Sequence, residues 1–123
     1  MKRILIVDDA ATVRMYHRSI LESAGYTVQE AMNGIEALEK AMQCPFDLYL
    51  VDINMPKLDG YGFLRRLRSE NIPQAPAIMV STEAASNDKM MAYRAGANCY
   101  FIKPIKPGQL LAHVQFLLGK VHS

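Results

Sequence analysis

The sequence predicts an α/β domain in which one five-stranded parallel sheet is covered by helices on both faces. Two observations support this fold class. Five short apolar or β-branched runs alternate with five segments of helical periodicity along the 123 residues. Strands that alternate with helices pair in parallel, and right-handed crossovers place helices on both faces of the sheet. Because this length suits one ordinary domain, we expect a single doubly wound domain over residues 1–123.

The first strand, the first helix and the second strand occupy the opening 31 residues. Residues 3–8 (RILIVD) and 26–31 (YTVQEA) contain apolar and β-branched side chains at a density typical of strands. Residues 11–24 repeat apolar side chains at helical spacing and end at Gly25, a residue type that often follows a helix. The predicted inward face of this helix consists of Val13, Tyr16, Ile20, Leu21 and Ala24.

The middle of the chain continues the alternation. Residues 33–43 predict a helix, and Asn33 stands three positions before Glu36, a spacing that resembles a capping box. Residues 47–52 (DLYLVD) are apolar between their first and last aspartates and predict the third strand. A further helix is predicted near residues 58–70, with phenylalanine and leucine side chains facing inward.

The last part of the chain predicts two strands and two helices. Residues 75–81 (APAIMVS) and 98–102 (NCYFI) are predicted strands. Between them, residues 86–95 predict a helix that ends before Gly96. Pro107 suits the first turn of the final helix. The inward face of that helix is predicted to consist of Leu110, Leu111, Val114, Leu117 and Leu118.

Charged and hydroxyl side chains stand where the predicted strands end. Asp8 and Asp9 follow the first strand, Asp52 ends the third, Ser81 ends the fourth, and Lys103 follows the fifth. Ligands of parallel α/β sheets bind beyond the carboxyl ends of the strands. We therefore expect these five side chains to converge at one edge of the sheet.

This set of residues favours a phosphoryl-transfer site. Two carboxylates 4 Å apart repel by about 4 kcal/mol at an effective dielectric constant near 20. A hard cation such as Mg²⁺ removes that repulsion and leaves room for a phosphoryl oxygen. Lys103 supplies a mobile positive charge suited to phosphate, and Ser81 supplies a hydroxyl donor. Asp52 is the candidate nucleophile, because carboxylates form aspartyl phosphates.

Four motifs carry a family resemblance. VDDA, VDINMPKLDG, MVSTEA and YFIKP occur in this order and at separations that are together specific. The chain resembles the receiver domain of two-component response regulators over residues 2–119, and is most similar to the stand-alone chemotaxis type. The resemblance implies a flavodoxin-like sheet with strand order 2-1-3-4-5.

The resemblance implies a role for each residue around the phosphoacceptor. Asp52 would accept a phosphoryl group from a phosphohistidine of a histidine kinase or phosphotransfer protein. Mg²⁺ would be bound by Asp9, Asp52 and the backbone carbonyl of Asn54, and by Asp8 mainly through metal-bound water. Ser81 and Lys103 would contact phosphoryl oxygens, and the Lys103–Pro104 peptide would be cis.

The resemblance also implies how phosphorylation is read and ended. Ser81 would move toward the phosphoryl group and free space for Tyr100, the switch aromatic. Asn54 and Glu83 match positions that set the lifetime of the phosphoryl group, here in the fast-cycling pattern. The expected output face joins the helix at 86–95, the strand at 98–102 and the last helix. It would include Lys89, Met90, Tyr93, Arg94, Tyr100 and Lys106.

Composition limits the expected partners. The 14 basic and 12 acidic residues give a formal net charge of +2, without the clustered basic run of a nucleic-acid or anionic-membrane surface. No apolar stretch approaches the roughly 20 residues that span a bilayer. We expect a cytoplasmic monomer that binds no nucleic acid and no membrane. His17, His113 and His122 show no ligand spacing and are expected to be solvated or capping.

We expect a signalling switch that catalyses only its own phosphorylation and dephosphorylation. No output domain is expected after the last helix, so the target is a separate protein, a flagellar motor switch or a relay component. A phosphorelay shuttle and a phosphorylation-independent pseudo-receiver remain alternatives. A Mg²⁺-dependent phosphohydrolase is disfavoured because Asn54 stands where that class uses an aspartate. A flavin-binding electron carrier is disfavoured because three carboxylates would repel a flavin phosphate.

Overall fold

The computed structural model describes residues 2–82 and 86–119. In this part of the chain, one sheet of five parallel strands has the order β2-β1-β3-β4-β5. The strands are β1 (Arg3–Val7), β2 (Thr27–Ala31), β3 (Leu48–Asp52), β4 (Ala77–Ser81) and β5 (Cys99–Ile102). The predicted parallel sheet and its order are confirmed.

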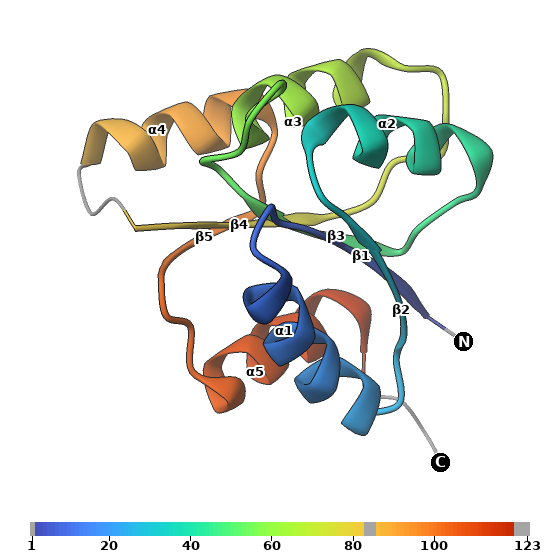
Figure 1. The fold of residues 1–123 in the computed structure, drawn as a ribbon, viewed down its shortest axis with the longest axis vertical. Coiled ribbons are helices and arrows are strands. Elements are labelled where there is room, and N and C mark those ends of the chain that lie inside the picture. Colours follow the sequence, from blue (N-terminus) through green and yellow to red (C-terminus); the bar gives the residue numbers. More distant parts are fainter. Residues whose placement is uncertain (1, 83–85, 120–123) are drawn as a thin grey trace.

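Helices cover both faces of the sheet. They are α1 (Ala11–Ser23), α2 (Gly34–Gln43), α3 (Gly60–Ser69), α4 (Ser86–Ala95) and α5 (Pro107–Leu118). Figure 1 shows α1 and α5 on one face and α2, α3 and α4 on the other. This is the doubly wound arrangement that the alternation of strands and helices predicted. None of these helices, within the described residues, is long and apolar enough to cross a membrane.

Two apolar clusters, one on each face of the sheet, form the core. Leu5 and Val7 of β1 pack with the layer of α2, α3 and α4. Ile4 and Ile6 alternate with them and pack with the layer of α1 and α5. Because both faces of the central strands β1, β3 and β4 are buried, these strands are nearly continuous apolar runs rather than alternating ones.

The strand register brings the carboxyl ends of the strands together. Val7, the last residue of β1, is the partner of Val51, which immediately precedes Asp52 in β3. Asp52 in turn is the partner of Val80 in β4. The residues that leave β1, β3 and β4 are therefore neighbours at one edge of the sheet.

Two helix starts differ from the predictions. The Asn33 side chain accepts a hydrogen bond from the Glu36 N–H at 2.9 Å, as in a capping box. The Glu36 carboxylate, however, accepts from the N–H of Met32 rather than from that of Asn33. The third helix begins at Gly60 rather than near residue 58, because the Asp59 side chain caps it by accepting from the Gly62 N–H at 2.8 Å.

The inward face of α1 also differs from the prediction. Tyr16, predicted to face inward, is 45% exposed, and His17, predicted to be solvated or capping, is only 4% exposed. His17 lies four residues before the fully buried Leu21, and residues at that spacing share one face of a helix. The more apolar tyrosine was therefore the wrong choice for this face.

Candidate functional site

Three carboxylates meet where β1 and β3 end. Asp8 and Asp9 follow β1, and Asp52 is the last residue of β3, the neighbouring strand. One oxygen from each of the three carboxylates lies within 4.8 Å of the others. Asp8 is 3% exposed and Asp52 is 5% exposed, whereas Asp9 is open to solvent. Two of the three charges are therefore largely removed from water.

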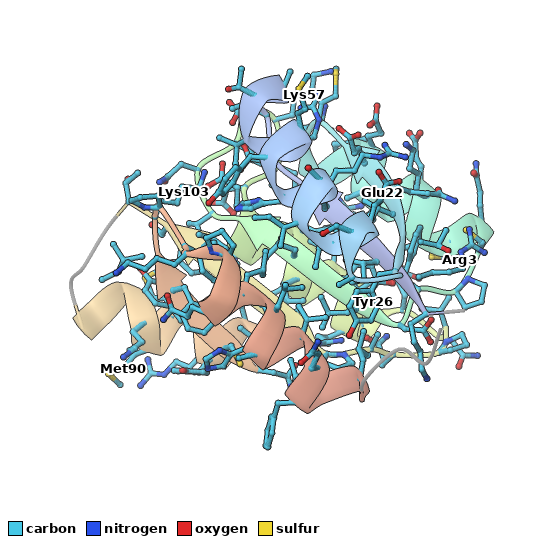
Figure 2. All side chains as sticks on the ribbon, turned by 90° about the horizontal axis from the view of Figure 1, so that it is seen from below. Arg3, Glu22, Tyr26, Lys57, Met90 and Lys103 are labelled. Carbon is cyan, nitrogen blue, oxygen red and sulfur yellow. The ribbon has the colours of Figure 1, made fainter. Side chains whose placement is uncertain are left out.

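Lys103 joins this acidic cluster from the end of β5. Its Nζ lies 3.0 Å from Oδ2 of Asp8 and 3.0 Å from Oδ1 of Asp52. Figure 2 shows Lys103 on the opposite side of the picture from Arg3, which lies at the start of β1. The Lys103 N–H donates to the Ser81 carbonyl at 2.7 Å, and the Lys103–Pro104 peptide is cis, as the resemblance implied.

Asp52 and Lys103 have shifted pKa values. Burial and the adjacent Asp8 charge raise the pKa of Asp52, while Lys103 and a hydrogen bond from the Asn54 backbone oppose the rise. Burial lowers the pKa of Lys103, but its contacts with Asp8 and Asp52 outweigh burial and leave that pKa raised. Lys103 therefore stays protonated and neutralises only part of the charge of three carboxylates.

The donor set of the acidic cluster suits a hard divalent cation. Mg²⁺ prefers oxygen ligands and is usually bound by a few carboxylates together with water and phosphate oxygens. Asp8, Asp9 and Asp52 provide such oxygens within reach of a single ion. The negative charge that Lys103 leaves unbalanced favours a cation at the same place. These three residues would hold the metal.

Comparison with known proteins agrees with this geometry. Residues 4–115 match the model of the response regulator receiver domain. The chain belongs to this family. As a family of signalling switches, receiver domains differ from enzymes that turn over an external substrate.

Individual relatives match nearly the whole chain. The transcriptional regulatory protein ResD of Bacillus subtilis is 34% identical over 118 residues, which cover 96% of this chain and 48% of the relative. The transcriptional regulator RpaA of Synechocystis is 37% identical over 121 residues, 98% of this chain and 50% of the relative. The receiver domain thus spans about half the length of these curated relatives.

A solved structure matches over nearly its full length. The chemotaxis protein CheY4 of Vibrio cholerae superposes with a TM-score of 0.90 at 34% identity, covering 96% of this chain and 99% of that one. The flavodoxin-like fold implied by the sequence is therefore shown by structure as well as by family.

The residues expected to act as the switch lie on β4 and β5. Ser81 ends β4 and is buried beside the register partner of Asp52. Tyr100 on β5 is 7% exposed and belongs to the cluster beneath α2, α3 and α4, so its ring is already inside in this structure. Glu83, expected to tune the phosphoryl lifetime, lies outside the described residues. The exposed members of the expected output face are Lys89, Met90, Tyr93, Arg94 and Lys106.

Gly60 shapes the backbone that carries Asp52. Its N–H donates to the Ile53 carbonyl at 2.9 Å, which draws the start of α3 onto the end of β3. A Cβ at Gly60 would lie 2.5 Å from the Asp52 carbonyl oxygen and 2.8 Å from the Ile53 Cα. This close approach requires glycine, so the glycine of the VDINMPKLDG motif supports the position of Asp52.

A basic residue for which the sequence pattern predicted no role lies next to the acidic cluster. A guanidinium nitrogen (Nη1) of Arg14, in the second turn of α1, donates to the backbone carbonyl of Asp8 at 2.7 Å. Its Nε pairs with Glu30 of β2 at 2.9 Å. The available signal was Glu30 itself, because a carboxylate that is partly buried on a strand needs a basic partner.

Proposed function

We propose that this receiver domain is a phosphorylation-activated signalling switch in which Asp52 accepts the phosphoryl group. The donor would be a phosphohistidine of a histidine kinase or of a phosphotransfer protein. The position of Asp52 is the observation that carries this function. Its carboxylate ends β3 among two further carboxylates and lies 3.0 Å from the Lys103 ammonium.

The proposed transfer forms one bond and breaks one bond. An Asp52 carboxylate oxygen attacks the phosphorus atom of the phosphohistidine. The phosphorus–nitrogen bond breaks, and its electron pair returns to the donor imidazole. Bound by Asp8, Asp9, Asp52 and the backbone carbonyl of Asn54, Mg²⁺ would supply positive charge opposite the phosphoryl oxygens. Lys103, already within 3.0 Å of Asp52, would supply the remaining charge.

The new group would then alter the ends of β4 and β5. A phosphoryl group adds about −1.5 to −2 charges and three acceptor oxygens. Lys103 and the Ser81 hydroxyl would turn toward those oxygens, and the bond from the Lys103 N–H to the Ser81 carbonyl couples the two segments. Tyr100 is the register partner of Met79, two residues before Ser81, so it would respond to this movement.

A few hydrogen bonds to the phosphoryl group can supply the free energy that the conformational change requires. Moving a population from 1:99 to 99:1 needs about 5.5 kcal/mol of differential stabilisation. Hydrogen bonds to charged groups contribute about 1.5–3 kcal/mol each. About two to four new contacts from Ser81 and Lys103 would therefore suffice to switch the face formed by α4, β5 and α5. A downstream partner, such as a motor switch or a relay component, would read that face.

Phosphorylation by a small donor tests this function. The protein is incubated with acetyl phosphate, with and without Mg²⁺, and its intact mass is measured. We expect one added phosphoryl group that requires Mg²⁺ and disappears within minutes to hours, because Asn54 matches the fast-cycling pattern. A folded protein that gains no phosphoryl group in Mg²⁺ would favour the pseudo-receiver alternative. Steady turnover of unrelated phosphate esters would favour a hydrolase.

A further inference from the structure

Arg14 contacts the turn that carries Asp8 and Asp9 but does not itself belong to the acidic cluster. We propose that Arg14 is a positioning residue for Mg²⁺ binding, which acts by fixing the backbone between Asp8 and Asp9. This role rests on the proposed function, because it concerns the metal that the phosphoryl transfer requires.

Besides the ion pair with Lys103, three hydrogen bonds fix Asp8 at the end of β1. Its N–H donates to the Ala31 carbonyl of β2 at 3.1 Å. One of its carboxylate oxygens accepts from the Ala10 N–H at 2.9 Å. Its carbonyl accepts from Arg14 at 2.7 Å, and this bond is charge-assisted. Arg14 thus controls the orientation of the peptide that links Asp8 to Asp9.

Arg14 is itself held firmly. Its side chain is 13% exposed, and its Nε lies 2.9 Å from Glu30 Oε1. Glu30 receives a second guanidinium, that of Arg18, at 2.5 Å on its other oxygen. The hydrogen bond from Arg18, followed by that from Arg14, lowers the pKa of Glu30, which therefore stays ionised at neutral pH. The contacts of Arg14 and Glu30 thus connect β2, α1 and the turn after β1.

The charge of Arg14 and its proposed role predict opposite effects on Mg²⁺ binding. A positive charge near the acidic cluster repels a cation, so removing the charge alone would strengthen Mg²⁺ binding. Losing the contact with the Asp8 carbonyl would instead leave Asp9 less well oriented and weaken binding. Partners that orient metal ligands typically contribute about 10- to 100-fold to metal affinity. The direction of the change therefore separates positioning from electrostatics.

Arg18 provides a matched control. It lies one helical turn after Arg14, carries the same charge and pairs with the same Glu30. Its other contacts are with the Val28 carbonyl and Glu22, away from Asp8. Arg18→Met therefore removes a charge and a Glu30 contact while leaving the Asp8 carbonyl bonded to Arg14.

The test is a Mg²⁺ titration of the full chain, followed by the amide NMR signals of Asp9 and Ala10, at a temperature where each variant is folded. We expect Arg14→Met to weaken Mg²⁺ binding about tenfold. Arg18→Met should bind Mg²⁺ as tightly as the wild type or slightly more tightly. Arg14→Lys keeps the charge, but one ammonium replaces a two-armed contact, so its affinity should lie between those of the wild type and Arg14→Met.

The outcomes separate this role from the proposed function. Unchanged or tighter Mg²⁺ binding by Arg14→Met, or equal weakening by Arg18→Met, would overturn the positioning role and leave the function of Asp52 intact. If Arg14→Met does not fold, Arg14→Lys decides, and wild-type affinity in that variant would overturn the role. A wild-type protein that binds no Mg²⁺ would overturn the proposed function, and the role of Arg14 with it.

Discussion

At the scale of single residues, the surroundings of Asp52 disfavour the ionised form of its carboxyl group. Burial and the neighbouring Asp8 raise its pKa, and Lys103 offsets only part of that rise. In the unfolded chain the Asp52 carboxyl has the ordinary pKa of about 3.9. The folded protein therefore holds this proton more tightly, and the ionised Asp52 destabilises the fold at neutral pH in the absence of a cation.

Asp52→Asn should consequently stabilise the Mg²⁺-free protein. We expect the free energy of unfolding at pH 7, measured by urea titration in a chelating buffer, to rise. The ionised Asp52 carboxyl destabilises the folded protein at pH values above its pKa in the folded state. This destabilisation disappears as the pH falls toward the pKa of the carboxyl in the unfolded chain. The difference between variant and wild type should therefore shrink toward zero as pH falls below 4.

Asp59→Asn is the matched control for that substitution. It also removes one carboxylate, but Asn caps a helix as well as Asp does, so the Gly62 N–H keeps its partner. Asp59→Asn should change stability little at any pH. An Asp52→Asn protein less stable than the wild type at pH 7 would show that the Lys103 ion pair outweighs the cost of burying Asp52.

The sequence predicted that the site residues converge, but it did not predict the contacts that hold them in place. Asp8, Asp9, Asp52 and Lys103 could be placed together because parallel strands end at one edge of the sheet. The contact of Arg14 with the Asp8 carbonyl could not be predicted, because it depends on a backbone orientation that no side-chain pattern records.

At the scale of secondary-structure elements, the junction between β3 and α3 carries Asp52. Gly60→Ala would place a methyl group 2.5 Å from the Asp52 carbonyl oxygen and 2.8 Å from the Ile53 Cα, both rigid backbone atoms. Relief requires the two elements to separate. We expect a loss of about 1–3 kcal/mol in the free energy of unfolding, measured by urea titration, and slower phosphorylation by acetyl phosphate.

Gly108→Ala is the corresponding control in α5. A Cβ there would meet no atom within 4 Å, and alanine favours a helix over glycine by up to about 1 kcal/mol. This variant should be as stable as the wild type or more stable, with unchanged phosphorylation. Wild-type stability in Gly60→Ala would mean that the junction yields easily and does not fix Asp52.

Element boundaries show where sequence patterns lose accuracy. Apolar periodicity located every helix, yet it chose Tyr16 over His17 for the inward face of α1, because hydrophobicity alone ranks tyrosine above histidine. The start of α3 was placed too early, since Asp59 caps the helix from a position that resembles an ordinary first-turn residue. Such errors of one or two residues arise from local hydrogen bonds rather than from the apolar pattern.

At the scale of the whole molecule, the proposed switch connects Asp52 to the face formed by α4, β5 and α5. In amide hydrogen exchange with acetyl phosphate and Mg²⁺, we expect altered rates in these three elements. The physical reason is the coupling of Ser81 to Lys103 and the placement of Tyr100 beside β4. The helix α2, on the far side of α3 from α4 (Figure 1), should keep its rates and serve as an internal reference.

Two exchange results would contradict this account of the switch. Changes confined to the loops after β1 and β3 would mean that the phosphoryl group is bound without altering the output face. Equal changes in Asp52→Asn would mean that they arise from acetyl phosphate or Mg²⁺ alone.

The overall fold was the part most accessible from sequence. Five buried strands and their crossover helices follow from apolar runs and from the handedness of connections. The strand order came from the resemblance and is confirmed by the register of β1 between β2 and β3. The resemblance implied that Tyr100 finds room inside once Ser81 has moved, yet its ring is already inside in this structure. A half-apolar ring suits both the core and the surface, so the sequence alone could not fix its position.

The most direct test of the central claim is to locate the phosphoryl group. After reaction with acetyl phosphate and Mg²⁺, borohydride reduction converts a phosphorylated aspartate to homoserine, which peptide mass spectrometry then maps. We predict homoserine at position 52 and unmodified aspartate at Asp8 and Asp9. Homoserine at Asp8 or Asp9, or none above the level of an untreated sample, would contradict the assignment of Asp52 as the phosphoacceptor.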